Sequence, residues 1–195
     1  MKSSSLIVVV LSAWFGLATT AILLGALQRV FPPVVLMTLL ATCLILVATV
    51  RSLRESLMRM NLKLLLLPHL IRFVGLAFLV MVNRGVLPEE FRSIGWGDLI
   101  AAIGASILLL GPPVATGRWR SAWIAWNAFG LTDMLILLGT AVRLGTRAPQ
   151  AFEIFRHLPM GLLPTFFVPL IITSHLVIFA RLLRRDRSPA PPVES

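Results

Sequence analysis

The stretch LLLLPHLIRFVGLAFLVMVN, residues 64–83, decides the fold of this chain. Apart from His69, Arg72 and Asn83 it is almost wholly apolar. About 20 apolar residues are what an α-helix needs to cross a bilayer core of roughly 30 Å. Five further stretches have a similar length and composition: residues 6–27, 33–50, 98–116, 122–142 and 158–182. The sequence therefore predicts an all-α membrane protein, a bundle of six transmembrane helices.

The overall composition leads to the same class of protein. Hydrophobic residues make up 57% of the chain, and the mean hydropathy of +0.91 is far from the balance of a soluble domain. We expect one polytopic transmembrane domain over residues 1–187. The tail at 188–195, with the sequence SPAPPVES, is polar and proline-rich, and we expect it to be disordered.

The first apolar stretch has two interpretations. Lys2, the apolar run after it and the small residues near Ala21 resemble a secretory signal. The run continues to Leu27, beyond the 7–15 residues of a typical signal core. The sequence therefore favours a first helix that is retained.

The net charge of +10 is concentrated at the ends of the apolar stretches, where arginines anchor helices and meet anionic lipid. With a cytoplasmic N-terminus, the positive-inside rule is satisfied, so we expect a multi-pass protein of the plasma or inner membrane with both termini in the cytoplasm. Expected partners are anionic lipids at the cytoplasmic face, and no interleaved basic and aromatic surface indicates nucleic acid. In this orientation the cytoplasmic segments carry Lys2, Arg51, Arg54, Arg59, Lys63, Arg118, Arg120, Arg181, Arg184, Arg185 and Arg187. The segments on the outer side carry Arg29, Arg84, Arg92, Arg143, Arg147 and Arg156.

Residues 51–62, after the second predicted span, are expected to form an amphipathic helix on the inner membrane surface. Leu53 and Leu57 fall on one face of this segment, while Arg51, Glu55 and Arg59 repeat every four residues on another.

Small residues recur every four positions on two of the predicted spans, at Ser12, Gly16 and Thr20 and at Gly97, Ala101 and Ala105. Such stripes let helix backbones approach closely, which indicates a compact bundle or a homo- or hetero-oligomer. Prolines at positions 68, 164 and 169 each remove a backbone donor and free the carbonyl four residues earlier. Those carbonyls need new partners, in a kinked packing helix or along a cavity.

Polar side chains inside the predicted spans are the candidate site, because ionisable groups at membrane depth cost roughly 2.5–3.5 kcal/mol each. A helix rises about 1.5 Å per residue. Counted from the nearest basic residue at the inner boundary, three of these side chains lie at one depth, about 9–10 Å from that boundary. Arg72 lies one helical turn beyond His69, and its simplest partner is Asp133, near the middle of the bilayer. The predicted intramembrane polar cluster is His69, Arg72, Asn127, Asp133 and His175, of which His69, Asn127 and His175 share the depth.

Three interpretations of this cluster stay open. An Arg72–Asp133 ion pair and two hydrogen-bonded histidines could simply fix the register of the bundle. The cluster could be a pathway for protons or a small solute, or the core of an accessory subunit. The third is a membrane redox protein in which His69 and His175 ligate a b-type haem or a metal ion.

A weaker candidate metal site lies in the predicted outer segments. Glu153 and His157 are four residues apart and, together with Glu89 and Glu90, could bind a divalent cation. The sequence has no Gly-rich phosphate loop, no His-Glu-x-x-His and no Gly-x-Ser-x-Gly, so we expect a protein that is not an enzyme. The leading hypothesis is a non-enzymatic membrane protein organised around Arg72 and Asp133.

Overall fold

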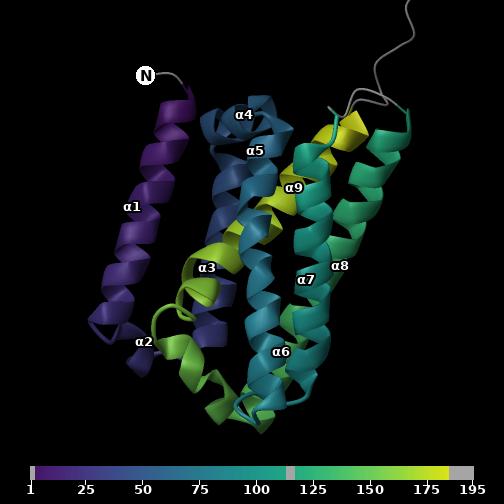
Figure 1. Ribbon diagram of the computed structural model, residues 1–195. Coiled ribbons are helices and arrows are strands. Elements are labelled where there is room, and N and C mark those ends of the chain that lie inside the picture. Colours follow the sequence, from purple (N-terminus) through teal and green to yellow (C-terminus); the bar gives the residue numbers. More distant parts are fainter. Residues whose placement is uncertain (1–2, 113–116, 185–195) are drawn as a thin grey trace, which may run out of the picture.

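The computed structural model describes residues 3–112 and 117–184, and within these ranges the chain is helical with no strand (Figure 1). The all-α prediction is therefore confirmed for this part of the chain, while the predicted tail at 188–195 lies outside it. Helix α1 (Ser3–Leu23) contributes a shorter apolar helix, Ile7–Leu23. Five helical stretches are long and apolar enough to cross a membrane: Pro32–Thr49, Leu62–Asn83, Glu90–Leu110, Arg118–Arg147 and Leu163–Arg184.

The elements follow one another with short connections. After α1 come α2 (Ala26–Arg29), α3 (Pro32–Thr49) and α4 (Arg51–Arg59); then α5 (Leu62–Leu66), the 3₁₀ segment η1 (Leu67–Val74) and α6 (Gly75–Asn83), which form one rod; then α7 (Glu90–Leu110), α8 (Gly117–Arg147), the 3₁₀ segment η2 (Pro149–Arg156), the π-helical segment η3 (Leu163–Phe167) and α9 (Val168–Arg184).

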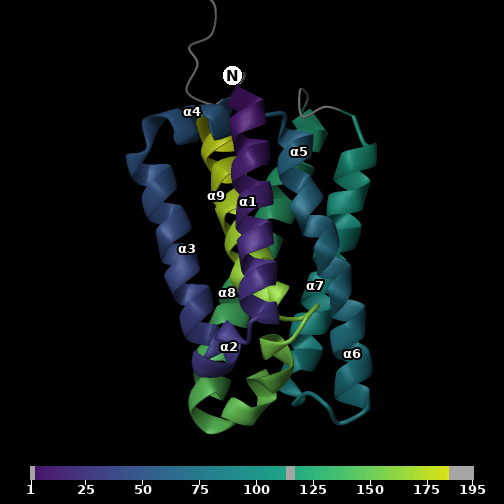
Figure 2. The ribbon, with the colours of Figure 1, turned by 90° about the vertical axis from the view of Figure 1, so that its left-hand side faces the viewer.

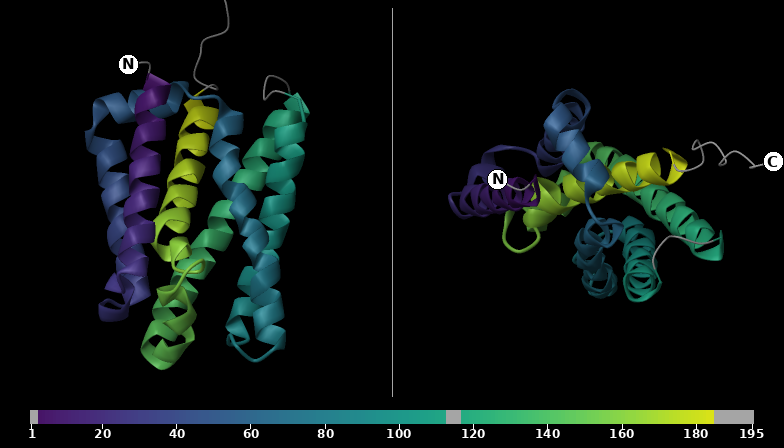
Figure 3. Two further views of the ribbon diagram at one scale, coloured as in Figure 1. Left: turned by 60° about the vertical axis from the view of Figure 1, so that its left-hand side comes forward. Right: turned by 90° about the horizontal axis from the view of Figure 1, so that it is seen from above.

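The long helices form a bundle with two recognisable ends (Figures 1 and 2). Helix α9 packs against α3 on one side and α8 on the other, and α7 packs on α8, η1 and α6. Helix α9 thus lies between α3 and α8, and α8 runs obliquely past it to pack beside α7 (Figure 3). The start of α1, helix α4 and the end of α9 lie together, and we name this end of the bundle the α4 end; the opposite end is the η2 end.

The predicted amphipathic segment is helical over Arg51–Arg59, and this helix crosses the end of the bundle instead of continuing α3 (Figure 1). Arg51 pairs with Glu55 on the same helix at 2.7 Å. The next helix starts where the Asn61 side chain accepts a hydrogen bond from the backbone N–H of Lys63 (2.9 Å), as a helix cap does.

Several boundaries differ from the sequence prediction, most clearly those of the fourth and fifth predicted spans. Helix α7 begins at Glu90, before the predicted start at residue 98, because Gly95-Trp96-Gly97 is helical instead of forming a loop. The glycine there is needed for close packing: a Cβ on Gly95 would come within 3.0 Å of Leu79. Helix α8 runs from Gly117 to Arg147, longer than the predicted 122–142, and η2 then precedes the last span.

The prolines place non-α geometry inside two spans. Pro68 opens η1, and Pro164 lies in η3. Pro169 lacks the N–H that would bond the Thr165 carbonyl, and the Trp14 indole N–H of α1 donates to that carbonyl instead (3.0 Å). Trp14 also packs edge-on against Phe166. The carbonyl freed by the proline is thus satisfied by a different helix.

Two apolar cores fill the bundle, and a layer of polar side chains separates them. The phenylalanine core, toward the η2 end, contains Phe78, Phe91, Phe152, Phe155, Met134 and Ile171 among others. The tryptophan core, toward the α4 end, contains Trp123, Trp126, Leu66, Leu108 and Ile178 among others. Four helical stretches pass from one core to the other through this polar layer: Leu62–Asn83, Glu90–Leu110, Arg118–Arg147 and Leu163–Arg184. The members of the polar layer are His69, Arg72, Asp98, Asn127, Asp133, Ser174 and His175.

Candidate functional site

Arg72 is the centre of the polar layer. Its guanidinium is 1% exposed and donates from Nε to Asp98 Oδ1 of α7 at 2.7 Å and from Nη2 to Asp133 Oδ2 of α8. Nη1 donates to the Gly130 carbonyl at 3.3 Å. One buried cation therefore contacts two buried carboxylates, which are only 3% and 7% exposed as residues.

Glycines at two close helix contacts leave the space that this cluster occupies. A Cβ on Gly97 would overlap the Asp133 carboxylate, so only glycine lets α7 and α8 approach with that carboxylate between them. A Cβ on Gly130 would lie 2.6 Å from His175 Cε1 and 3.1 Å from Arg72 Nη1. Glycine at this second position is what allows His175 and Arg72 to share one space against α8.

The hydrogen bonds assign the tautomers of both histidines. Asn127 donates from Nδ2 to the His175 carbonyl (3.0 Å), so its Oδ1 accepts from His175 Nδ1 (2.7 Å). His175 therefore carries its proton on Nδ1. The Ser174 hydroxyl donates to the Ile171 carbonyl (2.8 Å), so it accepts from His69 Nε2 (2.7 Å). His69 therefore carries a proton on Nε2.

The two remaining imidazole nitrogens, His69 Nδ1 and His175 Nε2, are buried and have no hydrogen-bond partner. The 3₁₀ geometry of η1 brings His69 and Arg72 onto one line, because residues three apart eclipse each other in such a helix. The His175 ring lies against Gly130 and Arg72, so its bare Nε2 lies beside the ionised cluster. A proton acceptor therefore lies near the Arg72 guanidinium.

The histidine pair does not fit a haem between its rings. The His69 and His175 centroids are 4.3 Å apart in an edge-to-face contact, and Trp126 packs on both rings at 4.9 and 5.2 Å. Rings in direct contact leave no gap for a porphyrin, and Trp126 covers them. Within the described residues no three His, Cys, Asp or Glu side chains gather as a metal site.

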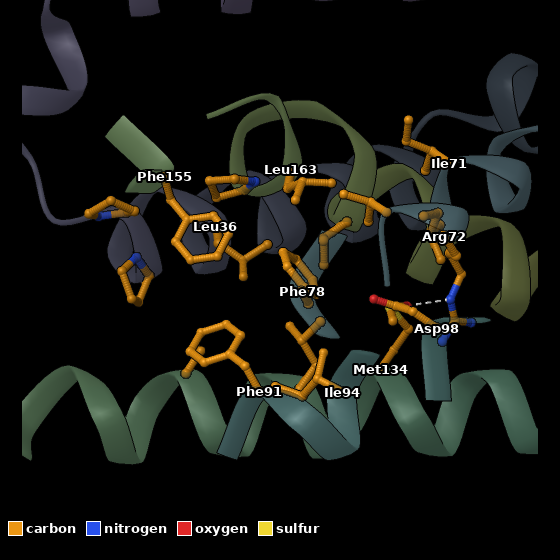
Figure 4. Close-up of a pocket in the computed structure, with 18 of the residues that line it drawn as sticks. Leu36, Ile71, Arg72, Phe78, Phe91, Ile94, Asp98, Met134, Phe155 and Leu163 are labelled. Carbon is orange, nitrogen blue, oxygen red and sulfur yellow. Dashed lines mark hydrogen bonds and ion pairs between the residues drawn. The ribbon is translucent and has the colours of Figure 1, made fainter. Parts of the chain in front are cut away.

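An apolar cavity of about 60 Å³ adjoins the polar layer on the side of the η2 end (Figure 4). Its walls come from the phenylalanine core, including Phe78, Phe91 and Phe155, while Arg72 and Asp98 close one end. A water molecule needs roughly 10–15 Å³ of such space and two to four polar partners. The cavity thus has room for water, but it offers polar partners only beside Arg72 and Asp98.

Of the weaker candidate metal residues, Glu153 and His157 lie close together, but no three His, Cys, Asp or Glu side chains gather around them in the described part of the chain. Glu89 accepts two hydrogen bonds from Arg92, and this contact lowers the pKa of the Glu89 carboxyl. Glu153 pairs with Arg156 at 3.2 Å and lies 3.7 Å from His157. The acidic groups therefore face basic residues of their own segments.

The structure brings all five residues of the predicted cluster into the polar layer, with Arg72 in contact with Asp133 and His175 in contact with Asn127. Sequence reasoning missed Asp98, which stands at the first position of the predicted span 98–116, and Ser174. The signal for Asp98 was its position beside the small-residue stripe of α7, which faces other helices. That these residues act together in a function stays a prediction.

Comparison with known proteins adds a family but no activity. Residues 29–183 match the family described as a domain of unknown function, DUF8737, and the chain belongs to that family. The matched range contains the whole polar layer and begins after α1. No curated protein and no solved structure matches the chain.

Proposed function

We propose that this member of the DUF8737 family is a multi-pass integral membrane protein whose polar layer binds and passes on protons. In this proposal six helices cross the membrane and the α4 end faces the cytoplasm. Helix α4, the start of α1 and the end of α9 lie at one end of the bundle (Figure 1). The excess of basic residues assigned to that side supports this orientation.

The observation that carries the proposal is the charge imbalance around Arg72. One guanidinium meets two carboxylates, so the cluster has a net charge of −1 if both aspartates are ionised and both histidines are neutral. An uncompensated charge away from water is strongly unfavourable. We therefore expect the cluster to hold one exchangeable proton, on Asp98, Asp133 or the bare Nε2 of His175.

In this proposal, access to the proton is one-sided. The cavity reaches the Arg72–Asp98 contact from the η2 end, whereas the tryptophan core covers the histidines toward the α4 end. Passage would thus require the apolar cavity to take up water on one side and the tryptophan core to open on the other. Such a closed core is what prevents a continuous leak in a protein that moves protons stepwise.

Two measurements test the proposal on the purified full-length chain. Infrared difference spectra of the protein titrated with acid should show a carboxylic C=O band that is lost in Asp98→Asn or Asp133→Asn. Vesicles containing the protein and a pH-sensitive dye should acidify faster than empty vesicles in response to a proton gradient. Asp133→Asn should abolish this flux, while Glu90→Gln, which changes an exposed carboxylate near the start of α7, should not.

The proposal fails if Asp133→Asn and Arg72→Met fold normally and leave the flux at the wild-type value. If the wild-type protein shows no flux and both variants lose their fold, the cluster serves only to hold the bundle together. That result would favour the accessory-subunit interpretation.

A further inference from the structure

A second cavity lies at the α4 end, and it shares no lining residue with the polar layer. It measures about 250 Å³ and lies between α3, α4 and α9. This exceeds the roughly 150 Å³ that holds a benzene molecule in an engineered apolar cavity. Its lining is apolar except for Arg54, Arg184 and Thr173, the other members being Leu44, Val47, Ala48, Leu57, Met58, Leu176, Val177 and Ala180.

The polar rim of this cavity is cationic. Arg54 and Arg184 are both exposed, and Arg54 is fixed in place by a hydrogen bond from Nη1 to the Ala48 carbonyl (2.8 Å). Glu55 is the acidic residue of α4, and it accepts from Arg51 and faces Arg59 instead. Thr173 adds no free donor, because its hydroxyl donates to the Pro169 carbonyl. In the part of the chain that the structure describes, neither Arg54 nor Arg184 meets a carboxylate.

We propose that this cavity binds one anionic phospholipid, with its phosphate between Arg54 and Arg184 and an acyl chain along the apolar wall of α3 and α9. Guanidinium groups pair with phosphate oxygens through two parallel hydrogen bonds, which a lysine cannot reproduce. The apolar wall accepts hydrocarbon.

The surroundings of the cavity favour a lipid over a free phosphate ion. Leu176, one of the apolar side chains that line the cavity, is 39% exposed, so the apolar wall is open on one side. A phosphate ion would leave this apolar surface uncovered, whereas an acyl chain covers it. The inference rests on the membrane location proposed above, but it is independent of the proton chemistry of the polar layer.

Native mass spectrometry of the detergent-purified full-length chain tests the site. Phosphatidylglycerol and phosphatidylcholine with the same acyl chains are titrated separately, and the fraction of protein carrying one lipid is measured. We expect the anionic lipid to bind at least about tenfold more tightly, because the quaternary ammonium of phosphatidylcholine neutralises its phosphate and is repelled by the two guanidinium groups, whereas phosphatidylglycerol keeps its negative charge. The double variant Arg54→Gln, Arg184→Gln should lose this preference.

The matched control is the double variant Arg51→Gln, Arg59→Gln. This control removes as much positive charge as the double variant at Arg54 and Arg184. Both of its changes lie on α4, at side chains that are more than 80% exposed and face Glu55. It should leave phosphatidylglycerol binding within about twofold of wild type. Equal losses in the two double variants would overturn the proposal, because general charge attraction would then explain the binding.

A second pair of variants tests the acyl wall. Ala180→Phe fills the cavity and should lower phosphatidylglycerol binding, whereas Ala128→Phe on the exposed surface of α8 should not. Glycerol phosphate at millimolar concentration should not displace the lipid. If it does, or if Ala180→Phe binds as well as wild type while remaining folded by circular dichroism, the site binds an anion and not a lipid.

Discussion

The charge imbalance around Arg72 makes an unusual prediction about carboxylate removal. Asp98→Asn and Asp133→Asn each keep the shape of the side chain and leave one carboxylate for the guanidinium. Opposite charges about 4 Å apart attract by about 4 kcal/mol at an effective dielectric constant near 20. When one carboxyl of the cluster carries the proton, only the other carboxylate is charged, so each single change leaves one ionised carboxylate beside Arg72 and keeps this attraction. We expect a net change within about 1 kcal/mol.

The double variant keeps no such attraction. It leaves the Arg72 guanidinium buried with neutral partners only, and a stranded buried charge costs about 3–5 kcal/mol. The free energy of unfolding should therefore fall by roughly 2–3 kcal/mol more than the two single changes predict together.

Unfolding of the purified protein by sodium dodecyl sulfate in mixed micelles measures all four proteins on one scale. Tryptophan fluorescence reports the transition, since Trp123 and Trp126 lie in the core beside the polar layer. Additive losses, within about 0.5 kcal/mol, would refute the charge argument. So would a loss of about 3 kcal/mol in either single variant, because both carboxylates would then be ionised partners that the fold requires.

The same unfolding assay tests the close contact of α7 and α8. Gly97→Ala places a methyl group against the Asp133 carboxylate and should destabilise the protein by about 1–3 kcal/mol. The control Gly139→Ala has no other atom within 4 Å and should be neutral or up to about 1 kcal/mol stabilising; equal effects would contradict the packing argument. At the start of α7, hydrogen bonding to Arg92 lowers the pKa of Glu89, so this contact stabilises the fold at neutral pH and is lost as the pH falls through the lowered pKa. In Arg92→Gln the Glu89 pKa should rise toward its ordinary value of 4.5 in a carboxyl NMR titration, and an unchanged value would show that the hydrogen bond is absent in solution.

The sequence could locate much of the polar layer because helical rise converts residue numbers into depth. Counting from basic anchors put His69, Asn127 and His175 at one level, and in the structure His175 contacts the other two. The same counting needs no knowledge of which helices are neighbours. It could not give the partners within the layer, since those depend on how the helices rotate about their axes.

Asp98 shows where the sequence argument failed. The predicted fourth span begins at residue 98, which puts Asp98 at the very end of a helix, away from the other polar side chains. Tertiary packing decides otherwise, because α7 approaches Gly75 and Asp133 too closely for larger side chains. Local sequence does not encode such an approach, and Asp98 therefore became visible as a partner of Arg72 only in three dimensions.

The hydrogen bond from Trp14 to the Thr165 carbonyl has a consequence for the first helix. Thr165 lies one turn before Pro169, on the stretch that leads to Ser174 and His175. If α1 were displaced, that carbonyl would lose this donor and, in the membrane proposed above, would need another. Helix α1 thus stabilises the start of the helix that carries Ser174 and His175.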